Sequence, residues 1–126
     1  MKQIVESANA PAAIGPYSQA IKAGNFLFIS GQIPIDPATG QIDAIDIGAQ
    51  TKRVLQNIEA ILAQEGLNFR DLVKTTVFLT NLSDFSRMND IYGQYIKDAP
   101  PARSTVQVSA LPKGSKIEIE AIAVLK

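Results

Sequence analysis

The last strand-like segment of the chain, residues 116–125, carries apolar side chains on both of its faces, and this pattern constrains the fold most. Alternate side chains of an extended strand point to opposite faces of a sheet. The first face is wholly apolar and consists of Ile117, Ile119, Ala121, Ala123 and Leu125. The second face is half apolar and consists of Lys116, Glu118, Glu120, Ile122 and Val124. In a sheet with helices on one side, the second face is normally polar and in contact with water. Because this second face is half apolar, we expect another subunit to cover it.

Two segments have the apolar periodicity of amphipathic helices. The longer one covers residues 46–65, where Asp46 is expected as the helix N-cap and Gly66 follows the last turn. The second begins at residue 83 or 84 and continues to about residue 97, ahead of a Pro-Pro pair that ends any helix.

Strands are expected before, between and after these helices. The segments with strand patterns are residues 17–23, 26–31, 71–81, 103–109 and 116–125, while the preceding N-terminal residues are expected to be irregular and residues 34–41 to form a turn. The resulting order is strand, strand, helix, strand, helix, strand, strand. This order predicts a single α+β domain over residues 1–126, with a mixed or antiparallel sheet and both helices on one face.

The amino-acid inventory limits the possible chemistry. Among 126 residues there is no Cys and no His, which excludes disulfides, a thiolate nucleophile, a zinc ribbon and a Ser-His-Asp device. Twelve basic and 12 acidic residues give a net charge of zero, which disfavours a nucleic-acid-binding role. Since the chain shows no signal-peptide pattern and no apolar stretch long enough for a membrane span, we expect a cytoplasmic protein.

Arg103 is a candidate for binding a carboxylate. It follows Pro100-Pro101-Ala102, so its backbone is expected to be extended and held in place. A guanidinium on a covered face needs a hydrogen-bond acceptor that can take two parallel N–H bonds, and the carboxylate of a ligand has this geometry. The alternative is a structural salt bridge to Glu118 or Glu120.

Glu118 is a candidate general base, because partial desolvation raises the pKa of a carboxyl group toward neutrality. If the last two strands form a hairpin whose paired residue numbers sum to 223, Thr105 lies opposite Glu118 and Arg103 opposite Glu120. Arg103, Thr105 and Glu118 would then share one face. The alternative is that both glutamates are solvated residues of an edge strand.

Four other residues have weaker signals. Tyr17 ends a Pro/Gly-rich loop and either presents its hydroxyl to a pocket or fills the core. Gly31, next to Ser30, either allows a ligand to approach the backbone closely or marks a bulge. Asn89 is a polar residue of the second predicted helix and either binds a ligand or faces water.

The sequence resembles the RidA/YjgF family of reactive-intermediate deaminases nearly from end to end. The segments that carry the resemblance are Ala10–Gln19, Ser30–Pro34, Val73–Leu79, Pro101–Ser104 and Ile117–Ala121. The stretch from Pro101 to Ile119 is similar to the signature segment of the family. One departure concerns Thr105, since many bacterial members have Cys at this position.

The resemblance implies a chorismate-mutase-like fold, a homotrimer whose sheets face the interior and active sites at the subunit interfaces. It also implies the hydrolysis of enamines and imines such as 2-aminoacrylate and 2-aminocrotonate to pyruvate or 2-oxobutyrate and ammonia, without a metal or cofactor. By resemblance, Arg103 binds the substrate carboxylate and Glu118 activates water. The pocket positions that the resemblance implies are Tyr17, Ser30, Gly31, Asn89 and Thr105.

Two other functions remain open at this point. A regulatory trimer could bind a small carboxylate in the same pocket without turnover, and Glu118 would distinguish it from an enzyme. An RNA-acting translation inhibitor is disfavoured by the neutral charge, the 6% aromatic content and the absence of His.

Overall fold

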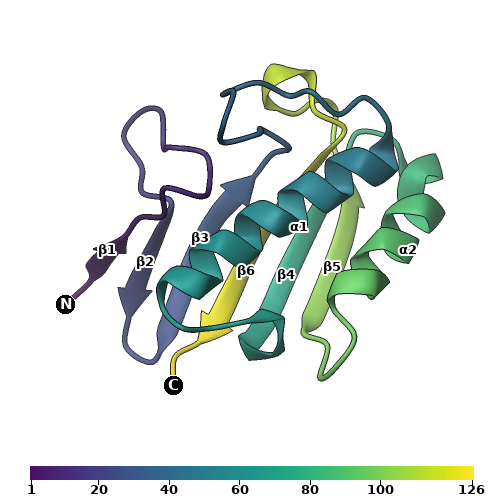
Figure 1. Cartoon of the computed structure of the whole chain (residues 1–126). Coiled ribbons are helices and arrows are strands. Elements are labelled where there is room, and N and C mark those ends of the chain that lie inside the picture. The colour runs from purple at the N-terminus through teal and green to yellow at the C-terminus, as the bar shows by residue number, and fades with distance from the viewer.

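A six-stranded sheet with two helices packed on one face makes up the chain, as a computed structural model of residues 1–126 describes it (Figure 1). The elements are β1 (Gln3–Val5), β2 (Ala20–Ala23), β3 (Phe26–Gln32), α1 (Ile47–Gln64), β4 (Leu72–Leu79), α2 (Phe85–Tyr95), β5 (Ala102–Gln107) and β6 (Ile117–Val124). The strand order across the sheet is β1-β2-β3-β6-β4-β5. The predicted α+β class and the placement of both helices on one face are confirmed.

The strand pairing corrects one expectation. The last two strands do not form a hairpin: β6 lies between β3 and β4, and β5 pairs parallel to β4 at the sheet edge. Arg103 pairs with Thr75 and Thr105 with Val77, so both lie on the helix-covered face. Glu118 pairs with Phe78 and therefore lies on the opposite, open face. The expectation that the three residues share a face of one chain is wrong, because α2 carries the chain from β4 to β5 as a parallel crossover.

Helix α1 covers the centre of the sheet, and its ends are those expected. The Asp46 side chain accepts a hydrogen bond from the Ala49 backbone at 2.9 Å, and Gly66 follows the last turn with a φ of 70°. Its apolar stripe is fully buried at Val54, Leu55, Ile58, Ile61 and Leu62. Helix α2 is shorter than expected, and Asp84 makes no side-chain cap, because a short 3₁₀ turn, Leu82–Asp84, precedes it.

The open face of the sheet remains partly apolar. The exposed apolar side chains on it include Ile4, Phe26, Phe28, Val106 and Val124. This is the half-apolar face that the sequence predicts, and its coverage by another subunit stays a prediction.

Two smaller features complete the fold. Strand β1 lies in the segment expected to be irregular and pairs antiparallel with β2; its three residues are too few for alternation to reveal. The predicted turn over residues 34–41 is closed by a bridge between Asp36 and Gln41.

No helix has both the length and the apolar character needed to cross a bilayer.

Candidate active site

Four of the predicted site residues line one pocket of about 550 Å³ beside the end of β3. They are Tyr17, Ser30, Gly31 and Glu118. They come from the loop before β2, from β3 and from β6, which adjoins β3 in the sheet. The rest of the lining includes apolar residues of the loops around the pocket, namely Pro11, Ala12, Ile14, Ile33, Ile35 and Pro112.

The absence of a side chain at Gly31 makes room for the Glu118 carboxylate. A Cβ atom built on Gly31 would overlap this carboxylate. The register between β3 and β6 shifts between Ile29 and Gln32, so Gly31 also lies within a bulge. Of the two interpretations of Gly31, the bulge is confirmed. The group that approaches its backbone is the side chain of Glu118, and the approach of a ligand stays a prediction.

Glu118 is half-buried on the central strand of the sheet. Desolvation by burial raises the pKa of its carboxyl group above the usual value, and the negative charge of Glu120 raises this pKa further. The alternative that the two glutamates belong to an edge strand is wrong, because β6 has neighbours on both sides. A carboxylate with a raised pKa in a pocket is suited to accept a proton.

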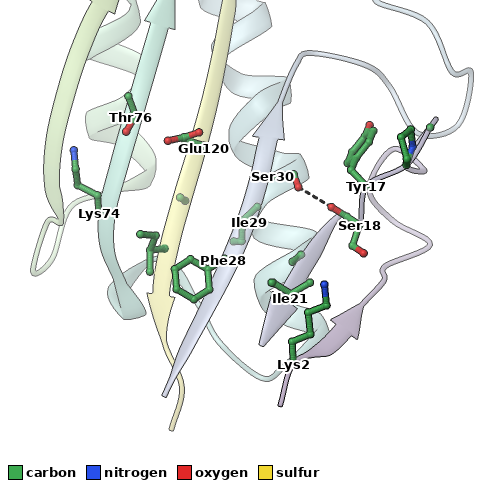
Figure 2. A pocket seen from close by; sticks show the side chains of 15 residues that line it. Lys2, Tyr17, Ser18, Ile21, Phe28, Ile29, Ser30, Lys74, Thr76 and Glu120 are labelled. Atoms are coloured by element: carbon green, nitrogen blue, oxygen red, sulfur yellow. Dashed lines mark hydrogen bonds between the residues drawn. The ribbon is translucent and has the colours of Figure 1, made fainter. Parts of the chain in front are cut away.

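Tyr17 and Ser30 line both this pocket and a second, neighbouring pocket. The second pocket, about 740 Å³, opens on the uncovered face and reaches Lys74, Thr76 and Glu120 (Figure 2). The Ser30 hydroxyl donates a hydrogen bond to the Ser18 carbonyl at 2.6 Å. Tyr17 is 54% exposed, so it does not fill the core.

Arg103 lies in a separate cluster that α2 and the helix-covered face of β5 form together. Its Nη1 donates a hydrogen bond to the Asn89 Oδ1 at 2.9 Å. Its Cζ lies 4.7 Å from the centre of the Tyr92 ring and 5.6 Å from that of Phe85. The only ion pair of the chain joins two other residues, so Arg103 makes no structural salt bridge to Glu118 or Glu120 within one chain. Most N–H donors of the guanidinium remain available for a ligand.

Thr105 follows Arg103 on the same face of β5. Its Oγ1 is buried and has no hydrogen-bond partner within the chain. A buried hydroxyl without a partner is uncommon in a native protein, so this atom needs a partner from outside the chain.

The structure thus divides the predicted site residues into two groups. Tyr17, Ser30, Gly31 and Glu118 form one group, whereas Asn89, Arg103 and Thr105 form the other, on the opposite face of the sheet. Phe85 and Tyr92 show only the apolar periodicity of a helix in the sequence and are not among the predicted site residues. Their spacing from Asn89 is the signal that could have placed them beside Arg103, since residues three and four apart share a helix face. No cluster of three or more acidic side chains is arranged to hold a metal ion.

Comparisons with known proteins give the following relatives. The family model described as Endoribonuclease L-PSP matches residues 7–125. A RutC family protein of Pyrococcus horikoshii is 57% identical over 98% of this chain and 98% of its own length. The 2-iminobutanoate/2-iminopropanoate deaminase of Homo sapiens is 47% identical over 98% of this chain and 90% of its own length. The crystal structure of E. coli TdcF with bound serine has a TM-score of 0.93 and 46% identity, covering 98% of this chain and 99% of the other.

Proposed function

Because this chain belongs to the Endoribonuclease L-PSP family, also called the YjgF/RidA family, we propose that it hydrolyses 2-imino and 2-enamino acids to 2-oxo acids and ammonia. Relatives at about 48% identity are named 2-iminobutanoate/2-iminopropanoate deaminase and reactive intermediate deaminase, which supports the reaction class. The proposed substrates are 2-aminoacrylate and 2-aminocrotonate, which give pyruvate and 2-oxobutyrate.

The observation that carries this proposal is the Glu118 carboxylate, half-buried against Gly31 in a pocket and with a raised pKa. A general base works best when its pKa approaches the working pH. Since the sequence contains no His and no Cys, a carboxylate is the natural group for this role. A site that only holds a small carboxylate would not need a desolvated acid in its pocket.

Arg103 is proposed to bind the substrate carboxylate. Its guanidinium has no ion-pair partner and uses one nitrogen on Asn89, which leaves other N–H groups for a bidentate contact. E. coli TdcF binds serine, an amino acid close in size to the proposed substrates. In the assembled site, Asn89 orients Arg103, and the unpartnered Thr105 hydroxyl bonds the ligand.

A site with both Arg103 and Glu118 requires two copies of the chain, because these residues lie on opposite faces of one sheet. A two-fold interface joins one surface patch to itself, whereas a head-to-tail contact joins two different patches and can close into a ring. A homotrimer with three interface sites satisfies this requirement, and it would cover the apolar open face as well.

The proposed reaction needs no covalent nucleophile. The enamine first tautomerises to the imine, whose carbon is electrophilic. Glu118 takes a proton from a water molecule while the water oxygen bonds to that carbon, which gives a carbinolamine. The imine nitrogen takes up one proton as the water adds and a second one from the Glu118 carboxyl group, and the C–N bond then breaks to release ammonia. The hydroxyl proton leaves to the solvent as the carbonyl of the 2-oxo acid forms, which balances the first proton taken up. Orientation by Arg103 and one general base suffice because the substrate is already activated.

The test is a coupled assay in which a dehydratase produces 2-aminoacrylate or 2-aminocrotonate in situ, and the appearance of the 2-oxo acid is followed. The wild type should accelerate this appearance. Glu118→Gln should lower kcat by roughly 100-fold or more, the usual contribution of a general base. Arg103→Ala should raise KM by roughly 30-fold or more, because a buried charged contact is lost.

Glu120→Gln is the matched control, since Glu120 lies two residues away on the same face but outside the Glu118 pocket. It should keep its activity at neutral pH. A wild type that binds 2-oxobutyrate but does not accelerate the reaction would instead support a binding-only role. Activity that survives both site substitutions would overturn the residue assignment.

A further inference from the structure

The aromatic ring of Tyr92 connects α2 to two adjacent strands of the sheet. Its hydroxyl lies 2.8 Å from the Thr75 Oγ1, and Thr75 is the residue that pairs with Arg103 in the parallel β4–β5 register. Its ring lies beneath the Arg103 guanidinium, 4.7 Å from Cζ. One side chain therefore contacts both members of a cross-strand pair, the first through its hydroxyl and the second through its ring.

This arrangement is buried and has little freedom to move. Tyr92 is 6% exposed and Thr75 is 1% exposed. Burial raises the pKa of the Tyr92 hydroxyl, while the Thr75 hydrogen bond and the Arg103 charge act in the other direction. The group therefore stays a neutral phenol, whose bond to Thr75 fixes the position of the hydroxyl, while the close packing around this buried side chain holds the ring.

The guanidinium of Arg103 has few other restraints. Within the chain it donates a hydrogen bond to Asn89 and makes no ion pair. A planar fork recognises a carboxylate only in a defined orientation, and a long Arg side chain otherwise has many rotamers. Stacking on Tyr92, with Phe85 further away, restricts the plane, whereas Asn89 restricts the rotation within that plane.

We infer that Tyr92, fixed by Thr75, is a positioning residue that holds the Arg103 guanidinium in the orientation required to bind the substrate carboxylate. This inference rests on the proposed function. Tyr92 touches no reacting atom in this scheme, so its loss affects the binding of carboxylates and leaves the proton transfer at Glu118 unchanged.

The decisive variants are Tyr92→Leu, which removes the ring, and Tyr92→Phe, which removes only the hydroxyl. Tyr92→Leu should raise KM by roughly 3- to 30-fold, the range of a cation–π contact, with kcat within about twofold of the wild type. Tyr92→Phe should raise KM by a smaller factor, because the ring remains but its hydrogen bond to Thr75 is lost. The same order should appear in the Kd for 2-oxobutyrate measured by calorimetry.

Tyr95→Leu is the matched control for the loss of a ring from α2. Tyr95 stacks edge-on against Phe69, with 6.0 Å between ring centres, and makes no contact with Arg103. It should destabilise the fold in a comparable way but leave KM and the 2-oxobutyrate Kd unchanged. An equal KM change in this control, or an unchanged KM in a folded Tyr92→Leu variant, would overturn the inference.

Two further outcomes separate this inference from the proposed function. If the wild type binds 2-oxobutyrate without deaminase activity, a weaker Kd in Tyr92→Leu supports the inference while the proposed reaction fails. If Tyr92→Leu does not fold, Thr75→Val keeps the ring and releases its hydroxyl, and it should raise KM without changing kcat. A wild type with neither activity nor 2-oxobutyrate binding would overturn the inference together with the proposed function.

Discussion

Arg103 and Glu118 lie on opposite faces of one sheet, the first covered by α2 and the second on the open side next to Gly31. The two groups that the proposed reaction requires are therefore separated by the sheet within a single chain. This relationship makes the role of the assembly testable by substitution.

Complementation between two inactive variants is the first prediction. At substrate concentrations well below KM, Arg103→Ala and Glu118→Ala should each be nearly inactive, but a mixture that is unfolded and refolded together should recover activity. In a head-to-tail ring, a site is intact when its Arg103 and Glu118 come from different variants, so roughly a quarter of the sites should recover. Refolding each variant alone is the control. No recovery in the mixture would contradict a site shared between copies.

The apolar open face should determine the oligomeric state. The wild type should sediment as a trimer, and Phe28→Asp should sediment as a monomer because it places a charge in the covered face. Ile45→Asp, at an exposed side chain in the loop before α1 and outside the Glu118 pocket, is a control that should remain trimeric. A wild type that is monomeric at micromolar concentration would refute the assembly.

Gly31→Ala should displace the Glu118 carboxylate, because the added Cβ overlaps it. We expect kcat to fall by roughly 10- to 100-fold, as the base loses its position relative to the water, and stability to fall by about 1–3 kcal/mol. Gly93→Ala is the matched control in α2, where no atom lies within 4 Å of the new Cβ. It should keep full activity and raise stability by up to about 1 kcal/mol.

The pH dependence should follow the raised pKa of Glu118. The base is active when ionised, so kcat should decline as the pH falls through this raised value. Glu120→Gln removes the nearby negative charge and should move the decline to lower pH. A pH–rate profile of the two proteins measures the shift, and coincident profiles would show that Glu118 does not set the decline.

The stability of the fold should change with pH in the direction opposite to that of kcat, and Glu118 is again the cause. A carboxyl group whose pKa is raised by folding is favoured in its neutral form, so stability decreases as the pH rises from the ordinary pKa to the raised one. Glu118→Gln should therefore be more stable than the wild type at neutral pH, and this difference should disappear in acid. Urea unfolding at the two pH values measures it.

Asn57 should stabilise the fold by holding the loop that borders the Glu118 pocket. It is fully buried in α1, and its Nδ2 donates hydrogen bonds to the carbonyls of Ile33 and Ile35 at 3.3 and 3.0 Å. Asn57→Ala leaves these carbonyls without their partner and should cost about 2–3 kcal/mol in urea unfolding. Glu59→Ala, at an exposed position of the same helix, should change stability by less than about 0.5 kcal/mol.

Local signals in the sequence predict local structure well. The Asp46 cap, the apolar stripe of α1 and the alternation of β6 are each properties of adjacent residues, and the structure confirms them. The strand order is not a local property. The assumption that sequence neighbours pair placed β5 beside β6, whereas α2 returns the chain parallel to β4.

The same distinction applies to the site. Gly31 and Glu118 are separated by most of the chain and meet because β3 and β6 are neighbours, which no periodicity encodes. Tyr92 looks like an ordinary residue of a helical stripe until its ring is seen beside Arg103. The residue types suggest the chemistry, but only the sheet order shows which of them can act together.

The division of charge between the two faces of the sheet also has a kinetic consequence. A dissociated chain would hold a carboxylate-binding arginine or a base for any one substrate molecule, but never both. The specific activity of the proposed deaminase should therefore fall on dilution, with a steeper than linear dependence of the rate on protein concentration below the dissociation range. The amount of protein in the cell would then set the onset of catalysis as well as its extent.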